Sequence, residues 1–369
     1  MQNSTLAKWF GALTVLIVVL SIVLHFQNPA PPDNASAPVS IALTNHFNPP
    51  QFVFHPHPAP APEAPPELDA AGQPKIPREK VEEWLAKHNR NAMSLLAAFR
   101  ALNDTNYLNE AATNFPNNPQ VELAVLAHDE FPQDRRKWLD LFKASSPSNS
   151  LANYLSAQDY FKNGNPDAAV QELTAASGKS QFDSFQTESR LDEEDLYLSS
   201  GYSQLESSKE SMTGISREDL PELATYKQLA MGIGDLQKQY LVAGDANSAA
   251  NLGQIGFAFG SQIESGDSGK YLINQLVGMS VEANSLSKLD QNTSYDFLGG
   301  ETPKQVLQEI KQQKAFYRQL GESIDAVYPD LSESELISFH QREKIYGEPA
   351  AMQWVIQQHP PNPPQNSPQ

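Results

Sequence analysis

The sequence LANYLSAQDYFKNGNPDAAVQELTAAS, from Leu151 to Ser177, contains two helical patterns separated by Asn163-Gly164-Asn165. Glycine readily adopts the left-handed conformations that end a helix, and asparagine is a good cap for the start of the next one. Small and apolar residues recur at helical spacing in the second half, at Ala169, Leu173 and Ala176. The stretch therefore predicts two antiparallel helices joined by a tight turn.

This hairpin resembles a tetratricopeptide (TPR) repeat. Tyr160 matches the aromatic residue that fills the gap between the two helices, and Gly164 matches the glycine of the turn. The small positions of the repeat are matched by Ala157, Ala169 and Ala176, and Pro147 stands where a preceding repeat would end. Asn153 and Arg135 depart from the pattern, which has a large apolar residue and an alanine there. The resemblance implies a stack of hairpins with a concave protein-binding face, and a generic helical hairpin is the alternative.

A second, degraded copy follows 80 residues later as YLVAGDANSAANLGQIGFAFG, from Tyr240 to Gly260. The aligned residues are Tyr240 with Tyr160, Gly244 with Gly164, Asp245 with Asn165, and Ala249 with Ala169. Gly253 replaces the apolar Leu173. Because 80 is not a multiple of the 34-residue TPR period, we expect extra chain between the copies, in the polar stretch 199–216.

Helical patterning continues across residues 78–358. Near its start, Val81, Trp84 and Leu85 recur at helical spacing. Thr302 before Pro303 is typical of a helix start, and Gly321 is expected to end that helix. Ser332 and Glu335 have capping-box spacing. The sequence predicts an all-α domain, either a TPR-like α-solenoid or an array of helical hairpins.

Residues 9–26, WFGALTVLIVVLSIVLHF, carry no charged side chain. A run of this length favours a transmembrane anchor helix. Lys8 precedes it and the first later charge is Asp33, so we expect residues 1–8 in the cytoplasm and the body outside. The inverted topology is one alternative. A cleaved signal peptide is the other, with Ala35-Ser36-Ala37 as its small-residue pattern.

Two proline-rich segments flank the helical domain. Residues 27–77 are expected to form a disordered, polyproline-like stalk, because 14 of the 28 prolines lie between positions 29 and 77. The stalk contains FNPPQFVFHPHP at 47–58, which is either a docking motif, a metal site formed by His46, His55 and His57, or an apolar patch in a linker. Residues 359–369 are expected to be a disordered tail.

No stretch of the chain carries a convincing catalytic, cofactor or metal motif. The chain has no cysteine, which excludes zinc–thiolate sites and thiol nucleophiles. Gly266-Asp267-Ser268-Gly269 lies between helical patterns and predicts a flexible turn, not a serine nucleophile. His88, His128 and His340 stand alone, and the acidic run 191–195 is expected to start a helix. We assign no catalytic, cofactor-binding or metal residue and expect no enzymatic activity.

The net charge is −18, from 44 acidic and 26 basic residues. Such a chain repels phosphate backbones, which disfavours nucleic-acid binding and favours basic or apolar protein partners. We expect a single-pass membrane protein of a bacterial inner membrane with a periplasmic body. Its expected function is a protein-interaction scaffold or envelope assembly factor. A self-associating structural component is one alternative, and an enzyme of an unfamiliar helical class, using residues such as His88, His128 and Glu130, is another.

Overall fold

The computed structural model describes residues 75–217 and 221–360. Within these ranges the chain forms fifteen α-helices and no strand, and 78% of the residues are helical, so the all-α prediction is confirmed. No helix in the described part of the chain is both long and apolar enough to span a membrane. The expected anchor at 9–26, most of the stalk, the histidine motif and residues 361–369 lie outside the described residues.

Most of the helices follow one another with short connections, and the longest one, residues 287–302, joins α13 to α14. Their bounds are α2 Arg78–Lys87, α3 Ala92–Leu102, α4 Thr105–Asn114, α5 Pro119–His128, α6 Arg135–Ser145, α7 Leu151–Lys162, α8 Pro166–Ser177, α9 Gln186–Ser199, α10 Gln204–Arg217, α11 Pro221–Val242, α12 Ala246–Ile263, α13 Leu272–Leu286, α14 Pro303–Val327, α15 Glu333–Tyr346 and α16 Glu348–Gln358.

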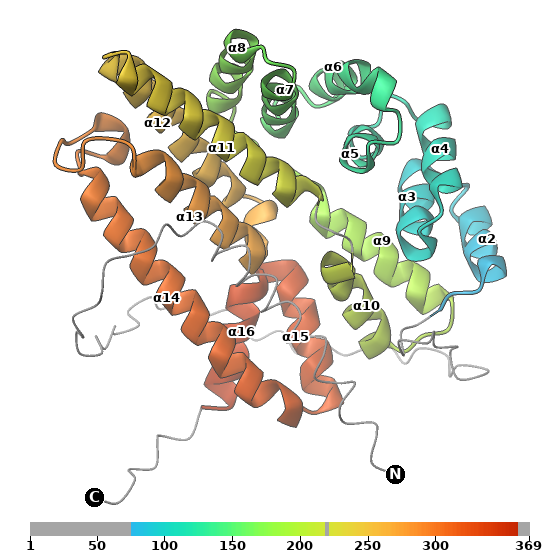
Figure 1. Cartoon of the computed structure of the whole chain (residues 1–369). Helices are drawn as coiled ribbons and strands as arrows, with labels where there is room; N and C mark the ends of the chain where they lie inside the picture. The colour runs from blue at the N-terminus through green and yellow to red at the C-terminus, as the bar shows by residue number, and fades with distance from the viewer. Residues whose placement is uncertain (1–74, 218–220, 361–369) are drawn as a thin grey trace, which may run out of the picture.

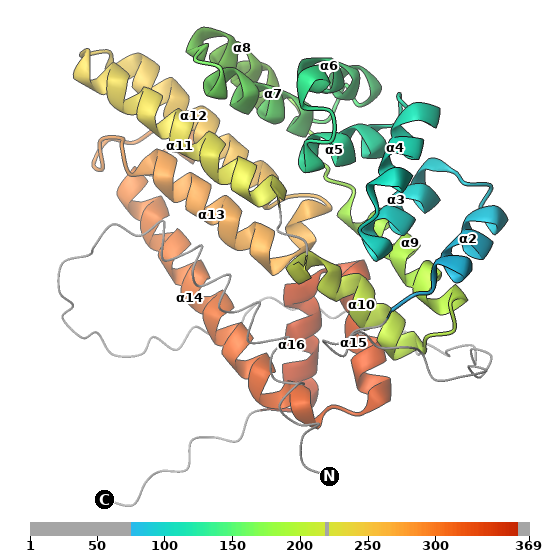
Figure 2. The ribbon, with the colours of Figure 1, turned by 45° about the vertical axis from the view of Figure 1, so that its right-hand side comes forward.

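Helices α2 to α8 form an arc, visible in both Figure 1 and Figure 2. Within the arc, α3 pairs with α4, α5 with α6, and α7 with α8. Helices α9 and α11 lie along the inner side of this arc (Figure 1). Contacts agree with the picture, since α9 packs on α2 and α3 while α11 packs on α7. The chain therefore covers part of the inner side of the arc with its own helices.

The hairpins α7/α8 and α11/α12 have matching turns. Gly164 and Gly244 both adopt positive φ, at 71° and 79°. In each turn the next residue caps the following helix: the Asn165 side chain accepts a hydrogen bond from the Ala168 N–H, and the Asp245 side chain accepts one from the Ser248 N–H. The two hairpins also stack on each other, α11 on α7 and α12 on α8.

Helices α9 and α10 are the extra chain between these stacked hairpins. The expected extra segment, 199–216, is therefore too short, because the insertion also includes α9, which begins at Gln186. Aromatic side chains pack together where α7, α11 and α12 meet. The ring centroids of Tyr154 and Phe259 lie 4.3 Å apart. Each such buried aromatic or aliphatic side chain contributes on the order of 2 kcal/mol to folding.

Helices α14 and α15 begin at the predicted caps. Thr302 and Ser332 each form a complete capping box, the latter with Glu335. The prediction that Gly321 ends its helix is wrong, since α14 continues to Val327. Gly321 is buried, and Ile324 one turn later belongs to the apolar cluster shared with α16. This packing offsets the cost of about 1 kcal/mol for an interior glycine.

Candidate functional site

The histidines considered from sequence have separate surroundings. His128 packs edge-on against Phe99 with ring centroids 4.7 Å apart, and burial lowers its pKa. Glu130 instead accepts a hydrogen bond from the Asn109 amide at 3.1 Å. His88 Nδ1 lies 2.9 Å from the carbonyl oxygen of Trp84, one turn earlier in the chain. The charge of Glu130 acts on His128 and opposes the lowering of its pKa, and no contact within the described residues joins either group to His88.

The acidic run 191–195 lies within α9, not at its start, so the prediction of a helix N-terminus there is wrong. Its carboxylates have partners far away in sequence. The Trp84 indole N–H donates to Asp195 at 2.7 Å, and Arg100 forms an ion pair with Glu193. Tertiary contacts therefore explain this run, and no local signal in the sequence identified the partners.

A buried ion pair connects the insertion to the C-terminal helices. Glu194 of α9 pairs with Lys344 of α15, and both side chains are nearly inaccessible to solvent. Ser208 of α10 donates a further hydrogen bond to Glu194 at 2.5 Å. Burial lowers the pKa of Lys344, although Glu194 opposes that shift. Removing one partner would leave a charge in a dry environment, which is far more costly than losing an exposed pair.

Next to this pair, His340 Nδ1 lies 2.7 Å from a Glu343 carboxylate oxygen, and the His340 Nε2 lies 3.2 Å from the Tyr328 hydroxyl. His340 and Glu343 are both buried. The lone histidine of the sequence is therefore part of a hydrogen-bonded group in the packed C-terminal region.

Two further carboxylates lie at the crossing of α12 and α13. Burial raises the pKa of Glu264, and the neighbouring Glu282 raises it further. Burial likewise raises the pKa of Glu282, while Lys314 of α14 opposes the shift. The Lys314 ammonium donates to the Ser280 hydroxyl at 2.9 Å. One lysine therefore faces two carboxylates between three helices.

One group of carboxylates has metal-ligand spacing within the described ranges. Oxygen atoms of Asp183, Glu188 and Asp267 lie within 4.8 Å of one another. Asp267 already accepts a 2.5 Å hydrogen bond from Thr187 Oγ1 and pairs with Lys270 at 2.9 Å. This lysine supplies the positive charge that a cation would otherwise provide, so we assign no metal to the group. Ser268, in the same connection, is buried and lies 3.0 Å from the Ser184 hydroxyl oxygen.

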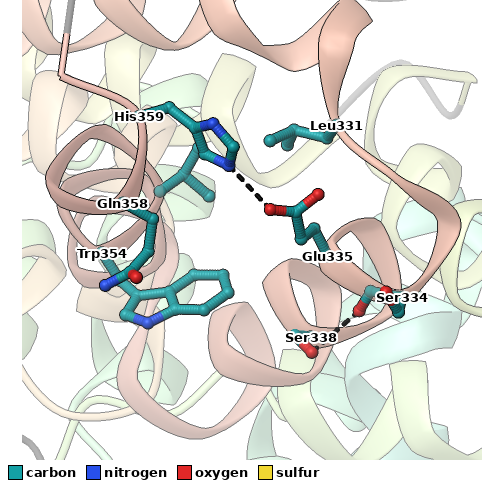
Figure 3. A pocket seen from close by; sticks show the side chains of 8 residues that line it. Leu331, Ser334, Glu335, Ser338, Trp354, Gln358 and His359 are labelled. Atoms are coloured by element: carbon teal, nitrogen blue, oxygen red, sulfur yellow. Dashed lines mark hydrogen bonds and ion pairs between the residues drawn. The ribbon is translucent and has the colours of Figure 1, made fainter.

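A hollow of about 270 Å³ lies between the first turns of α15 and the last turn of α16. Figure 3 shows Trp354 and His359 on one side of the opening and Leu331 and Glu335 on the other. Its complete lining is Leu331, Ser334, Glu335, Ser338, Trp354, Val355, Gln358 and His359.

The charges of this hollow are paired with each other. His359 Nε2 lies 2.7 Å from Glu335 Oε1. Hydrogen bonds from Ser332 and the contact with His359 hold the pKa of Glu335 at about 2. The hollow therefore combines an indole ring with a carboxylate that is in hydrogen-bond contact with an imidazole. A second hollow of about 450 Å³ lies beside Tyr295 and Phe297.

Five large apolar side chains are markedly exposed among the described residues, and three of them are on α11: Met231, Leu241 and Val242. Met231 is 52% exposed and Val242 is 91% exposed. They are eleven residues apart, which is just over three full helical turns, so they lie on the same face. Between them, Asp235 and Lys238 form an exposed ion pair at 3.6 Å. We call Met231, Asp235, Lys238 and Val242 the α11 ridge.

No protein-family model matches this chain, and no significant match is found among curated proteins or solved structures.

Proposed function

We propose that the protein is a membrane-tethered, extracytoplasmic scaffold that binds other proteins without catalysis. The observation that carries this proposal is the stacking of α7/α8 on α11/α12 through matching turns. Stacked hairpins of this kind form TPR-like solenoids, whose common role is to offer an extended surface to protein partners. The proposed anchor at 9–26 and stalk at 27–77 would hold this surface away from a bacterial inner membrane.

The α11 ridge is the surface we propose for the partner. Its apolar ends lose water on contact, and the acidic body around it favours a partner with apolar and basic residues. An exposed ridge on one helix also suits binding to a groove of the partner. The same ridge could bind a second copy of the chain, and the experiment below separates the two cases.

The test is site-specific photo-crosslinking of the full chain in intact membranes. A photoreactive residue replaces Val242 in one variant and Ile345 in the control, which is 60% exposed on α15. The proposal expects one reproducible heterologous product from position 242 and none from position 345. Crosslinks to a second copy at position 242 would favour the self-associating component instead. If neither position yields a reproducible product, the scaffold proposal is wrong.

The substitution Met231→Asp provides the matched binding variant. It places a charge on the ridge without removing a buried contact, since Met231 is half exposed. We expect it to abolish the product from position 242 while the helical content stays unchanged. The control Leu191→Asp alters an equally exposed residue on α9 and should leave the product intact.

A further inference from the structure

The hollow between α15 and α16 has an aromatic wall. The indole ring of Trp354 forms this wall, and the Arg342 guanidinium stacks on the same ring, 4.4 Å from its centroid. Aromatic-lined grooves are the surfaces that bind proline-rich peptides, whose polyproline conformation is already formed before binding.

A segment with this chemistry begins at the rim of the hollow. His359 lines the hollow, and the sequence continues as PPNPPQNSPQ at 360–369, with five prolines and no charged side chain. An uncharged segment fits the lining, because the Glu335 carboxylate would repel an acidic peptide and already has His359 as its partner. We propose that this proline-rich tail docks against Trp354 in the hollow of its own chain.

Length and tethering favour this occupant over others. The nine residues after Pro360 would span about 28 Å in a polyproline conformation. This length is enough for the segment to turn back into the hollow, which His359 lines directly before it. A segment tethered so closely has an effective concentration in the millimolar range, so weak contacts suffice to keep the hollow filled. The proline-rich stalk at 27–77 has similar chemistry but is attached more than 250 residues earlier in the chain.

The first test uses the full chain and a variant that stops after Pro360. A fluorescent PPNPPQNSPQ peptide is titrated into both, and binding is followed by anisotropy. The shortened chain should bind the peptide at least about tenfold more tightly, because its hollow has no tethered competitor. Equal binding by the two chains, or binding by neither, would overturn the proposal.

Substitution of the tryptophan separates docking from adventitious peptide binding. In the shortened chain, Trp354→Ala should weaken peptide binding about tenfold or more, since tryptophan is a common anchor of such contacts. Gln254→Ala, in the second hollow, is the control and should leave binding unchanged. Circular dichroism shows whether each variant is folded. Unchanged affinity in a folded Trp354→Ala variant contradicts the proposal.

Disulfide trapping tests the contact without removing Trp354. The natural chain has no cysteine, so Ser338→Cys with Ser367→Cys introduces a single pair. Ser338 lines the hollow. The control pair is Ser287→Cys, at the end of α13, with the same Ser367→Cys. Mild oxidation should join only the first pair, within one chain. A product between two chains, or equal products from both pairs, would show that the tail does not dock in cis.

A competition experiment identifies the alternative occupant. The competitor is the unlabelled stalk peptide HPHPAPAPEAPP, residues 55–66. If it displaces the fluorescent tail peptide at a lower concentration than the unlabelled tail peptide does, the stalk is the segment that occupies the hollow. That result would overturn the assignment to the tail. The tail inference does not rest on the proposed scaffold function, because it uses isolated peptides and needs no partner protein.

Discussion

Gly260 of α12 and Gly278 of α13 face each other so closely that a Cβ on either would lie 2.6 Å from the carbonyl oxygen of the other. A glutamate of the opposite helix also packs against each glycine. Glu282 Cγ lies 2.4 Å from where a Cβ of residue 260 would be, and Glu264 Cγ lies 2.4 Å from where a Cβ of residue 278 would be. The crossing therefore depends on two missing side chains, and it places two carboxylates in the same interface.

We predict that Gly260→Ala destabilises the protein by about 1–3 kcal/mol, because overpacking exceeds the gain of about 1 kcal/mol in helix propensity. The matched control is Gly178→Ala at the end of α8, where the new Cβ meets nothing nearer than 4.0 Å and the backbone is right-handed. Urea unfolding of detergent-solubilised full chain, followed by circular dichroism, measures both. Equal stability of the two variants would contradict the tight crossing.

We predict that the α12–α13 crossing makes the protein less stable as the pH rises. Burial raises the pKa of both Glu264 and Glu282 above their values in the unfolded chain, and the charge of Glu282 raises that of Glu264 further. The folded state therefore binds more protons, and the free energy of unfolding contributed by this pair falls as the pH rises above about 5, where the carboxylates of the unfolded chain are ionised. Lys314 is the basic group that faces the pair, and it offsets only one of the two charges.

The variant Glu282→Gln isolates this effect from other titrating groups such as Glu348, whose pKa burial also raises to about 7. We expect the variant to lose part of the pH dependence and to gain stability relative to the natural chain at pH 8. Thermal unfolding at pH 5, 6, 7 and 8 measures the difference. Identical pH profiles for the two chains would show that the carboxylates do not interact.

We predict that Lys344→Met destabilises the protein by about 3–5 kcal/mol, because it leaves the buried Glu194 without its cation. The double variant Lys344→Met, Glu194→Gln should recover most of this loss. The control Lys238→Met breaks the exposed ion pair with Asp235 and should change stability by no more than about 0.5 kcal/mol. Chemical denaturation compares the four chains. A loss in the control as large as in Lys344→Met would remove the distinction between buried and exposed pairs.

The expected topology is testable because the natural chain has no cysteine. Val242→Cys places a thiol on the exposed end of α11, and Ser4→Cys places one before the anchor. In intact cells a membrane-impermeant maleimide should label the first variant and not the second until the membrane is permeabilised. The reverse pattern indicates the inverted topology. An intact mass lacking residue 4 indicates a cleaved signal peptide.

Local sequence signals predicted those features that depend on neighbours a few residues apart. The caps at Thr302 and Ser332 and the turn at Gly164 depend on contacts within three or four positions, and the structure has all of them. The buried side chains of Val81, Trp84 and Leu85 follow from helical spacing alone. The hollow between α15 and α16 was not among the predicted features, because its lining residues Trp354 and Leu331 come together only when the two helices pack.

Sequence alone determined that this chain is helical, where several of its helices begin, and which hairpins are alike, because helix periodicity and capping are short-range interactions. Only the tertiary structure decided that α11/α12 stacks on α7/α8 and that the acidic run of α9 pairs with Trp84, Arg100 and Lys344. It also decided that α14 passes through Gly321. These outcomes depend on burial and pairing between residues that are distant in sequence, where the energy of packing and of neutralising a buried charge exceeds local preference.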